Sequence, residues 1–281
     1  MPELPTVEIF RQYLIKKDIR DVQIEKVHLF WERSVLSPTP ESFVQSVEGT
    51  KITEISRRGK WIVIHLSEGI LGIHLRMTGS LEVLGHSEGL KPYARTIFEL
   101  NDGRKLIFID PRKFGKVWFG LSTDKIFSNL GPEPLGPTLL SKEEFQFDYF
   151  ENVVKKRNVF VKTLLLDQSV VVGIGNIYAD EILLEATISP FARTNDLLKG
   201  EILDLYNAIL NVMANAIKAL GTLLDLGFLP IGTEESREHF ALPRFRDSRC
   251  QKCSTVTQKT VINGRGTYYC FMCQNSRLEK I

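Results

Sequence analysis

Four cysteines near the end of the chain constrain its fold more than any other feature of the sequence. Cys250 and Cys253 form one C-x2-C pair, Cys270 and Cys273 form a second, and sixteen residues lie between the two pairs. This spacing is typical of a structural zinc site with four thiolate ligands. Disulfides are the poorer interpretation, because four cysteines this close together cannot staple a chain of 281 residues. The pattern predicts one structural Zn²⁺ ion.

The residues between the two cysteine pairs predict a β-hairpin. Asn263-Gly264 is a strong signal for a two-residue turn, and it places Arg265 at the tip. Residues 237–281 contain nine Lys and Arg against three Asp and Glu, a net charge of +6, whereas the whole chain carries only +2. A basic hairpin held by a metal suits a phosphate backbone or a DNA groove, and a solvated charged face is the alternative.

The start of the chain, Met1-Pro2-Glu3-Leu4-Pro5, contains a candidate nucleophile. Removal of Met1 leaves the secondary amine of Pro2 at the terminus, with the Glu3 carboxylate beside it. An α-amino group titrates near ~8, so part of it is neutral and can attack an electrophilic carbon. On a sugar aldehyde carbon the adduct is a cationic iminium, and Glu3 can act as general acid or base. The alternative is an ordered entry into a first helix, predicted over residues 6–17.

After the first helix the pattern changes to short strands separated by turn residues. Asn101-Asp102-Gly103 is a strong hairpin turn among them, and a helical stretch at residues 40–47 interrupts the strands. This many antiparallel strands favour a β-sandwich with helices packed against it. The predicted strands are residues 22–30, 50–56, 61–66, 72–75, 80–84, 96–100, 105–109 and 116–119.

Residues 131–137 contain three prolines and two glycines, which indicates a domain boundary. The chain after them is helical in pattern, with helices predicted at residues 142–147, 149–166, 175–185 and 196–220 and a stop at Gly221. We therefore predict an α+β fold of two domains, an antiparallel β-sandwich and a helical domain that carries the zinc ribbon. The predicted boundaries are 1–131 for the β-sandwich, 132–138 for a hinge linker, 139–245 for the helical domain and 246–281 for the zinc-finger hairpin.

Three loops in the β-rich half carry candidate functional residues. Lys60, in Arg57-Arg58-Gly59-Lys60-Trp61, could clamp a phosphate, and a basic hairpin tip with no ligand is equally consistent. Arg112 and Phe114 lie at the tip of a predicted loop, where a cation and a ring can enter an opened base pair. Met77, in the stretch HLRMTG, is a candidate wedge, and core filler is the alternative.

Asn176 lies at the start of a predicted helix, after a turn that contains two glycines. Helix N-termini present unpaired N–H groups and a partial positive charge. Asn176 is therefore well placed to bind a phosphate oxygen through its amide and the nearby backbone. An N-cap role is the alternative, because Asn is also favoured there.

Taken in order, these motifs resemble one family closely. The chain is similar over nearly its whole length to the formamidopyrimidine-DNA glycosylases of the Fpg/Nei superfamily. The resemblance implies a β-sandwich domain joined by a hinge to a helix-two-turn-helix domain with a zinc finger. It also implies a bifunctional enzyme of base excision repair, which removes oxidised purines and then cleaves the abasic site by β,δ-elimination. The motifs that carry the resemblance are PELP, RRGK, HLRMTG, DPRKFG, LLLDQSVVVGIGNIYADE and NGRGTYYC.

The resemblance also implies catalytic roles for four residues. Pro2 matches the family's proline nucleophile, which forms a Schiff base with the sugar, and Glu3 matches the adjacent catalytic glutamate. Lys60 matches a phosphate-contacting lysine, and Arg265 matches the zinc-finger arginine. Leu4 favours the Fpg branch over the endonuclease VIII branch, whose start resembles PEGP.

Four further residues are implied to contact DNA. Asn176 matches the asparagine of the helix-two-turn-helix motif. The other three match residues that fill the gap left by the extruded nucleotide and face the orphan base. They are Met77, Arg112 and Phe114.

The sequence departs from the family pattern at three places. Thr6 replaces a second acidic residue near the nucleophile, residues 91–95 replace a KHxH-like stretch, and residues 223–243 differ from the loop that closes over 8-oxoguanine. These departures put excision of 8-oxoguanine in question and leave formamidopyrimidine removal and abasic-site cleavage in place. The alternatives are a relative with altered lesion specificity, for oxidised pyrimidines or abasic sites only, and a non-catalytic protein that binds damaged DNA.

The expected partner is damaged double-stranded DNA, and we expect a monomer. We expect no membrane association, because the N-terminus lacks the basic and apolar regions of a secretory signal and no run approaches ~20 apolar residues. The resemblance implies the bacterial cytoplasm, at the nucleoid, as the location.

Overall fold

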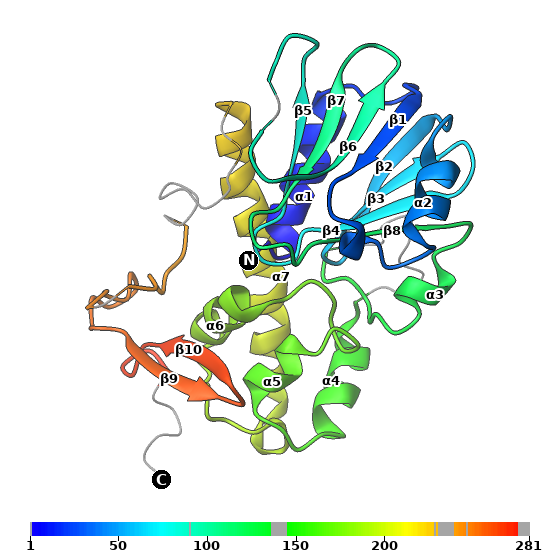
Figure 1. The fold of residues 1–281 in the computed structure, drawn as a ribbon. Helices are drawn as coiled ribbons and strands as arrows, with labels where there is room; N and C mark the ends of the chain where they lie inside the picture. The colour runs from blue at the N-terminus through cyan, green and yellow to red at the C-terminus, as the bar shows by residue number, and fades with distance from the viewer. Residues whose placement is uncertain are drawn as a thin grey trace. The chain divides into compact units, whose positions relative to one another are not determined.

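The computed structural model describes residues 2–89, 91–135, 145–227, 229, 239–245 and 247–274. The chain divides into two compact units, and the boundary between them lies at Ser128 and Asn129. The predicted linker at residues 132–138 is described only as far as Leu135. Figure 1 shows the β-rich first unit and the helical second unit, each of which is considered separately.

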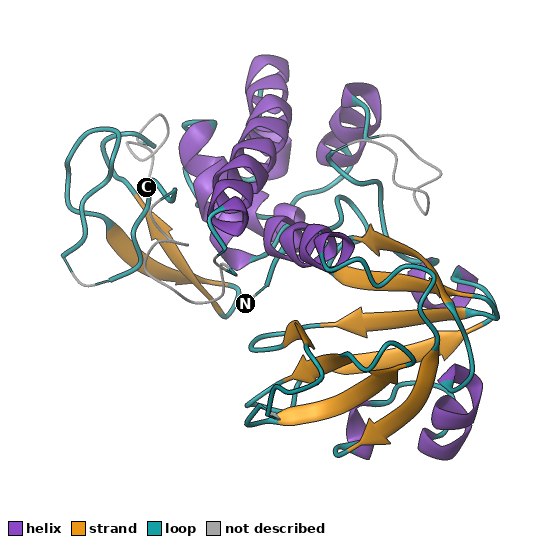
Figure 2. Ribbon diagram, turned by 90° about the horizontal axis from the view of Figure 1, so that it is seen from above, coloured by secondary structure: helices purple, strands orange, loops and turns teal. Residues whose placement is uncertain are grey.

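The first unit contains two antiparallel sheets of four strands, ordered β1-β6-β7-β5 and β2-β3-β4-β8, which are the two sheets of a β-sandwich (Figure 2). All eight predicted strands are confirmed. Helices α1 (Leu4–Lys16), α2 (Pro40–Val47) and the short α3 (Asp124–Phe127) flank the sheets. The strands are β1 (Ile24–Leu29), β2 (Ile52–Arg58), β3 (Trp61–Leu66), β4 (Ile70–His74), β5 (Ser80–Leu84), β6 (Ala94–Leu100), β7 (Lys105–Ile109) and β8 (Lys116–Gly120).

One end of the β1-β6-β7-β5 sheet gathers four loops. Strand β1 ends at Leu29 and β7 at Ile109, whereas β5 begins at Ser80 and β6 at Ala94. Because each strand pairs antiparallel with its neighbour, these four termini lie at the same end of the sheet. We call this the loop end of the sheet. It brings together residues 30–34, 76–79, 91–93 and 110–115.

The second unit is built from helices α4 (Phe147–Lys155), α5 (Val161–Leu166), α6 (Asn176–Glu185) and α7 (Lys199–Asp225). Their apolar faces form one core, in which α6 packs against α7. Helix α7 has the length and composition of a membrane span, with a hydropathy of 1.2 in its most apolar window. Its buried face packs on α4 and α6, as expected of a core helix in a globular unit.

Two helix boundaries differ from the prediction. The single helix predicted over residues 149–166 is two helices, because Phe160 is extended and forms an antiparallel bridge with Arg193. Helix α7 runs through Gly221 to Asp225, because Leu220 and Leu224 continue its buried face on either side of the glycine. A glycine inside a helix costs about 1 kcal/mol, which this packing outweighs. Of the helix predicted at 142–147, residues 142–144 lie outside the described residues, Phe145 and Gln146 are not helical, and Phe147 begins α4.

The zinc ribbon ends the second unit. Strands β9 (Gln258–Ile262) and β10 (Arg265–Tyr269) pair antiparallel, with Arg265 opposite Ile262. The turn residues Asn263 and Gly264 have φ values of 46° and 73°, the left-handed pair that a tight hairpin turn requires. The predicted hairpin is therefore confirmed.

Candidate active site and nucleic-acid interface

The N-terminal site residues lie at the start of helix α1. Glu3 is the N-cap residue with extended backbone, and its carbonyl accepts the first helical hydrogen bond from Val7 N at 3.0 Å. Both Pro2 and Glu3 are buried, and Glu3 is only 1% exposed. The first helix was predicted, and it fixes the backbone of Glu3, the residue that follows Pro2.

Helix α1 is fixed to the hairpin that carries Lys60. Arg57 Nε donates to Glu8 Oε2 at 3.0 Å, and Arg57 Nη1 donates to the carbonyl of Gly59 at 3.2 Å. Burial opposes ionisation of Glu8, but Arg11 and Arg57 hold the pKa of this carboxyl below its usual range. The buried pair therefore ties the helix of Pro2 and Glu3 to the turn at Gly59 and Lys60. The sequence interpretation missed it, although Glu8 follows the apolar Leu4 by four residues and therefore lies on the same buried face of the helix.

At the loop end of the sheet, Asp110 joins the two loops that were predicted to enter DNA. Thr78 Oγ1 donates to Asp110 Oδ1 at 2.5 Å, and Gly115 N donates to Oδ2 at 2.6 Å. Asp110 is 1% exposed. A side chain at Gly115 has no room, since its Cβ would lie 2.2 Å from the Phe108 ring. The Asp-Pro and Gly residues of DPRKFG could have identified this turn from the sequence.

The tips of these two loops are exposed. Met77 is 43% exposed and Phe114 is 47% exposed. The interpretation of Met77 as core filler is therefore wrong. The Arg112 guanidinium lies 4.8 Å from the centroid of the Phe114 ring, so a cation and a ring are presented together.

His74 adds a neutral polar group beside positive charges. Burial, together with the charges of Arg76 and Lys60, lowers its pKa to about 3. Its Nδ1 accepts a hydrogen bond from Arg76 N at 3.0 Å, and its ring packs edge-on to Trp61. The charges that keep His74 neutral would attract a phosphate group. His74 was not predicted as a site residue, although it begins the HLRMTG motif.

In the second unit, the four cysteines form the predicted metal site. Their four sulfur atoms all lie within 4.8 Å of one another. The Cys253 and Cys270 sulfurs are 3.3 Å apart, and those of Cys250 and Cys273 are 3.9 Å apart. A tetrahedral site with Zn–S bonds of about 2.3 Å needs sulfurs roughly 3.8 Å apart, so four thiolates here fit zinc. The buried Cys250 and Cys270 pack on Leu184 of helix α6.

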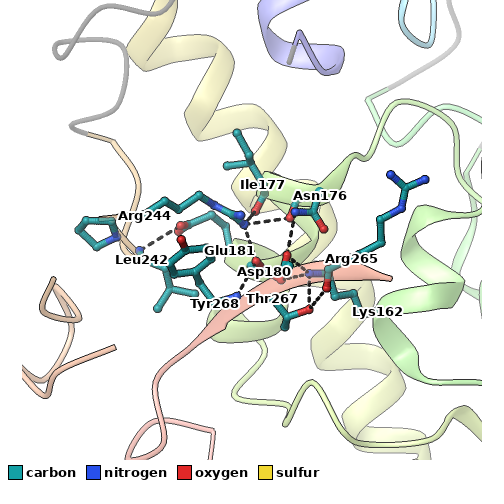
Figure 3. A network of polar contacts seen from close by, with 12 residues as sticks. Lys162, Asn176, Ile177, Asp180, Glu181, Leu242, Arg244, Arg265, Thr267 and Tyr268 are labelled. Carbon is teal, nitrogen blue, oxygen red and sulfur yellow. Dashed lines mark hydrogen bonds and ion pairs between the residues drawn. The ribbon is translucent and has the colours of Figure 1, made fainter. Parts of the chain in front are cut away.

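Asn176 is the first residue of helix α6 and faces the ribbon (Figure 3). Its Nδ2 donates to the carbonyl of Gly266 at 2.9 Å. The residue at the N-cap is Gly175, so the interpretation of Asn176 as an N-cap is wrong. Arg265, the residue before Gly266, is exposed, and Figure 3 shows its side chain directed away from the network. Asn176 of α6 is thus bonded to Gly266, the residue that follows Arg265 in β10.

A buried ion cluster underlies this contact (Figure 3). The Nζ of Lys162 lies 2.7 Å from Asp180 Oδ1, and both side chains are at most 1% exposed. Arg244 is paired with the other oxygen of Asp180, which also accepts a hydrogen bond from Tyr268 N at 2.9 Å. Lys162 Nζ also donates to Thr267 Oγ1 at 2.7 Å. Helices α5 and α6 thereby fix the ribbon strand next to Arg265, a role that periodicity alone could not reveal.

We expect Lys162→Met to lower the free energy of unfolding by about 3–5 kcal/mol, because it leaves the buried Asp180 carboxylate with one cation fewer. Urea unfolding of the variant and the parent protein measures this difference. Lys155 offers a matched control, since its pair with Glu151 is made by a side chain that is 56% exposed. Lys155→Met is expected to cost far less, because water screens an exposed ion pair. Equal losses in the two variants would contradict a special role for the buried pair.

Residues 230–238 lie outside the described residues. The chain that follows them is hydrogen-bonded to Glu181 of helix α6. Glu181 accepts hydrogen bonds from Ala241 N at 2.8 Å and Leu242 N at 3.0 Å, and burial raises the pKa of its carboxyl to about 7. His239, at the start of this part of the chain, is half-buried. Its ring stacks on Tyr178, and burial lowers its pKa to about 4. Of residues 223–243, where the sequence departs from the family pattern, the structure describes 223–227, 229 and 239–243.

Known families match all three parts of the chain. The formamidopyrimidine-DNA glycosylase N-terminal domain matches residues 1–117, and the H2TH domain of the same enzymes matches residues 130–225. A zinc finger found in FPG and IleRS matches residues 247–275. A formamidopyrimidine-DNA glycosylase of Protochlamydia amoebophila (strain UWE25) is 36% identical over 280 residues, covering 98% of this chain and 99% of the relative. The chain belongs to the formamidopyrimidine-DNA glycosylase family.

Further relatives and solved structures agree with this family. The formamidopyrimidine-DNA glycosylase of Bacillus subtilis (strain 168) is 34% identical, covering 99% of this chain and all of the relative. A structure of MutM in complex with carbocyclic 8-oxo-G containing DNA has a TM-score of 0.85 at 30% identity and covers 98% of this chain and 100% of that one. Lactococcus lactis Fpg bound non-covalently to DNA with an AP site has a TM-score of 0.84 at 30% identity, with the same coverage.

The predicted site residues of this family member divide between the two units. In the first unit, contacts link the helix of Pro2 to the Lys60 turn, and the Met77 loop to the loop of Arg112 and Phe114. In the second unit, contacts bring Asn176 next to the Arg265 strand. The first-unit residues are Pro2, Glu3, Lys60, Met77, Arg112 and Phe114, and those of the second unit are Asn176, Arg265 and the four cysteines.

Proposed function

We propose that this glycosylase of base excision repair is bifunctional, with an abasic-site lyase activity whose nucleophile is the amine of Pro2 after loss of Met1. The observation that carries the proposal is that Pro2 and the buried Glu3 lie at the N-terminus of α1, where Glu3 is the N-cap residue. The match to the glycosylase family over the full length of the chain supports it.

In the proposed mechanism the damaged nucleotide is first rotated out of the duplex. The nitrogen of Pro2 attacks C1′ of the sugar, the bond from C1′ to the base breaks, and the base leaves with its bonding electrons and takes up a proton. Glu3 supplies or accepts protons as the sugar ring opens. The resulting iminium makes the C2′ proton acidic, so its removal expels the 3′ phosphate. A second elimination expels the 5′ phosphate.

The remaining predicted residues hold the DNA for this chemistry. Lys60, Asn176 and Arg265 would bind backbone phosphates, which fixes the position of the flipped nucleotide. Met77, Arg112 and Phe114 would fill the gap and face the orphan base, as their exposure allows. The zinc ion, when bound by the four cysteines, supplies rigidity to the ribbon and no chemistry. The proposed divisions at residues 1–131, 132–138, 139–245 and 246–281 assign the two sets of residues to separate domains.

The proposed substrates are oxidised purines in duplex DNA, with formamidopyrimidine as the preferred base. Relatives named for formamidopyrimidine span the chain at 34–36% identity. Thr6, where the family pattern has an acid, is only half-buried next to the buried Glu3. We propose that this substitution lowers excision of 8-oxoguanine more than it lowers cleavage of abasic sites.

We propose that the enzyme acts as a monomer in the bacterial cytoplasm, at the nucleoid, without membrane association. Bacterial relatives of full length support this location. The +6 net charge of residues 237–281 supports direct binding to DNA.

A panel of lesion duplexes tests the proposed substrate class. We expect formamidopyrimidine to be released at least about tenfold faster than thymine glycol, since pocket contacts typically discriminate by 10–200-fold. Abasic duplexes should be cleaved without any glycosylase step. Faster release of the oxidised pyrimidine would show a relative with altered specificity, and tight binding with no release or cleavage would show a non-catalytic binder.

A further inference from the structure

We propose that the loop end of the β1-β6-β7-β5 sheet carries a second nucleic-acid surface, which binds single-stranded DNA. The surface consists of three aromatic and three cationic residues from neighbouring loops and from the start of β6, and we call it the aromatic-cationic patch. None of them belongs to the predicted catalytic or wedge residues. They are Phe30, Trp31, Arg33, Tyr93, Arg95 and Lys113.

Two rings of the patch are open to solvent. Phe30 is 57% exposed and Tyr93 is 59% exposed, values that are high for large aromatic side chains. The backbone places them together, because Phe30 N donates to the carbonyl of Arg95 at 2.9 Å and Tyr93 precedes Arg95 by two residues. Tyr93 has a φ of 65°, an unusual conformation for a bulky residue. Strain of this kind tends to occur where a side chain has a function.

Each cation of the patch lies over one of its rings. The Lys113 ammonium is 4.3 Å from the centroid of Trp31, and the Arg33 guanidinium is 5.6 Å from it. The Arg95 guanidinium is 5.8 Å from the centroid of Tyr93. Across the described part of the chain, none of these three cations forms an ion pair with a carboxylate. Two acidic residues lie in the loops of the patch, the exposed Glu32 and the buried Asp110, whose carboxylate accepts hydrogen bonds from Thr78 and Gly115. The three cations of the patch outnumber these carboxylates, so the patch keeps a net positive charge.

This combination of side chains matches single-stranded DNA. Bases of a single strand can stack on exposed aromatic rings, whereas bases of a duplex are already stacked on each other. The cations can contact the phosphates between these bases. Stacking of each cation on a ring holds that cation near the aromatic surface. Rings alternating with cations that have no carboxylate partner are less suited to a protein partner, whose interface core is depleted of charge.

The patch continues the proposed wedge surface. Lys113 lies between Arg112 and Phe114 in sequence, and Arg95 Nε donates to the carbonyl of Asp110 at 2.7 Å. A strand that leaves the opened base pair at Phe114 would therefore meet Lys113 of the patch, the neighbouring residue in the same loop. This inference rests on the proposed function, because that function identifies the strand as DNA in which the wedge residues have broken a base pair. The enzyme would then favour lesions beside unpaired nucleotides.

Fluorescence anisotropy with a labelled twelve-nucleotide oligothymidylate tests the patch in the full-length protein. We expect the double variant F30A/Y93A to bind this probe at least about tenfold more weakly, because each stacked base contributes roughly 1–3 kcal/mol. The charge variant R33A/K113A should reduce the slope of log affinity against log salt by about 1.4, the value for two phosphate contacts to a single strand.

Arg20 and Lys51 provide a charge-matched control at the opposite end of β1. Their side chains are 72% and 51% exposed. R20A/K51A removes the same formal charge as R33A/K113A and should leave the affinity and the salt slope near the parent values. The proposal is overturned if F30A/Y93A binds the probe as tightly as the parent protein, or if R20A/K51A loses as much as R33A/K113A.

Borohydride trapping on an abasic duplex separates this proposal from the proposed function. F30A/Y93A should still form the trapped adduct, which also shows that it is folded. A parent protein that binds the oligothymidylate through the patch but forms no adduct would overturn the lyase activity and leave the patch in place. A parent protein that forms the adduct but does not bind the probe would overturn the patch alone.

Discussion

Borohydride added to the mature protein with an abasic-site duplex is expected to give a covalent protein–DNA adduct, and protein that retains Met1 is expected to give none. In the mature chain, the Pro2 nitrogen is an amine that can form an iminium at C1′. With Met1 attached, the same nitrogen is part of a peptide bond and has no available lone pair. Removal of a nucleophile typically costs at least about 10³-fold, so cleavage of the abasic strand should fall by that factor or more.

The two forms can be prepared from one sequence, by expression with and without an inhibitor of methionine aminopeptidase. Intact-mass measurement establishes which form is present, and gel electrophoresis after reduction measures the adduct. Both forms should bind undamaged duplex with similar affinity, because their other DNA contacts are the same. An adduct of equal yield from the Met1 form would show that the attacking amine lies elsewhere, for example on a lysine.

Pro2→Gly offers a finer test of the same chemistry. The variant has a primary amine, whose adduct with the sugar is an imine that must gain a proton before it withdraws electrons. We expect an adduct that accumulates more slowly than the one formed by the proline. A protein that only binds damaged DNA would be indifferent to the substitution.

The fold could be predicted well from the sequence where local patterns decide it. The eight strands and the ribbon turn at Asn263 and Gly264 follow from alternation and turn residues, which act over a few positions. The break between α4 and α5 could not be predicted, because it depends on the bridge between Phe160 and Arg193, two residues far apart in the chain. The continuation of α7 past Gly221 likewise depends on packing against other helices.

The site shows the same division. Residues that would touch DNA occupy exposed loop tips with recognisable motifs, and Met77 and Phe114 were identified in this way. The residues that position them are buried and make contacts distant in sequence. Asp110 contacts Thr78 from 32 positions away, and Lys162 contacts Thr267 from 105 positions away. A single sequence gives no signal for such pairs beyond a polar residue in an apolar surrounding.

Loss of zinc is expected to weaken binding to duplex DNA by at least about 100-fold. A two-stranded hairpin such as β9 and β10 is at best marginally stable alone, whereas a structural zinc ion contributes roughly 10–16 kcal/mol in zinc-finger peptides. Unfolding of the ribbon removes Arg265 from its place and frees Asn176 from the Gly266 carbonyl. Two lost charge-assisted contacts at about 1.5–3 kcal/mol each correspond to a 10²–10⁴-fold loss.

Cys270→Ser tests this expectation, because Cys270 is fully buried in the metal site. Native mass spectrometry should find one zinc ion per parent chain and none in the variant, and anisotropy should show the loss of duplex affinity. Met272→Ser is the matched control, since Met272 lies between Cys270 and Cys273 in the sequence and is 62% exposed. It should keep both the zinc and the affinity. Because the ribbon belongs to the second unit, the unfolding transition of the first unit should be unchanged in both variants. A zinc-free Cys270→Ser protein that binds duplex as tightly as the parent would show that Asn176 and Arg265 do not depend on the ribbon for their placement.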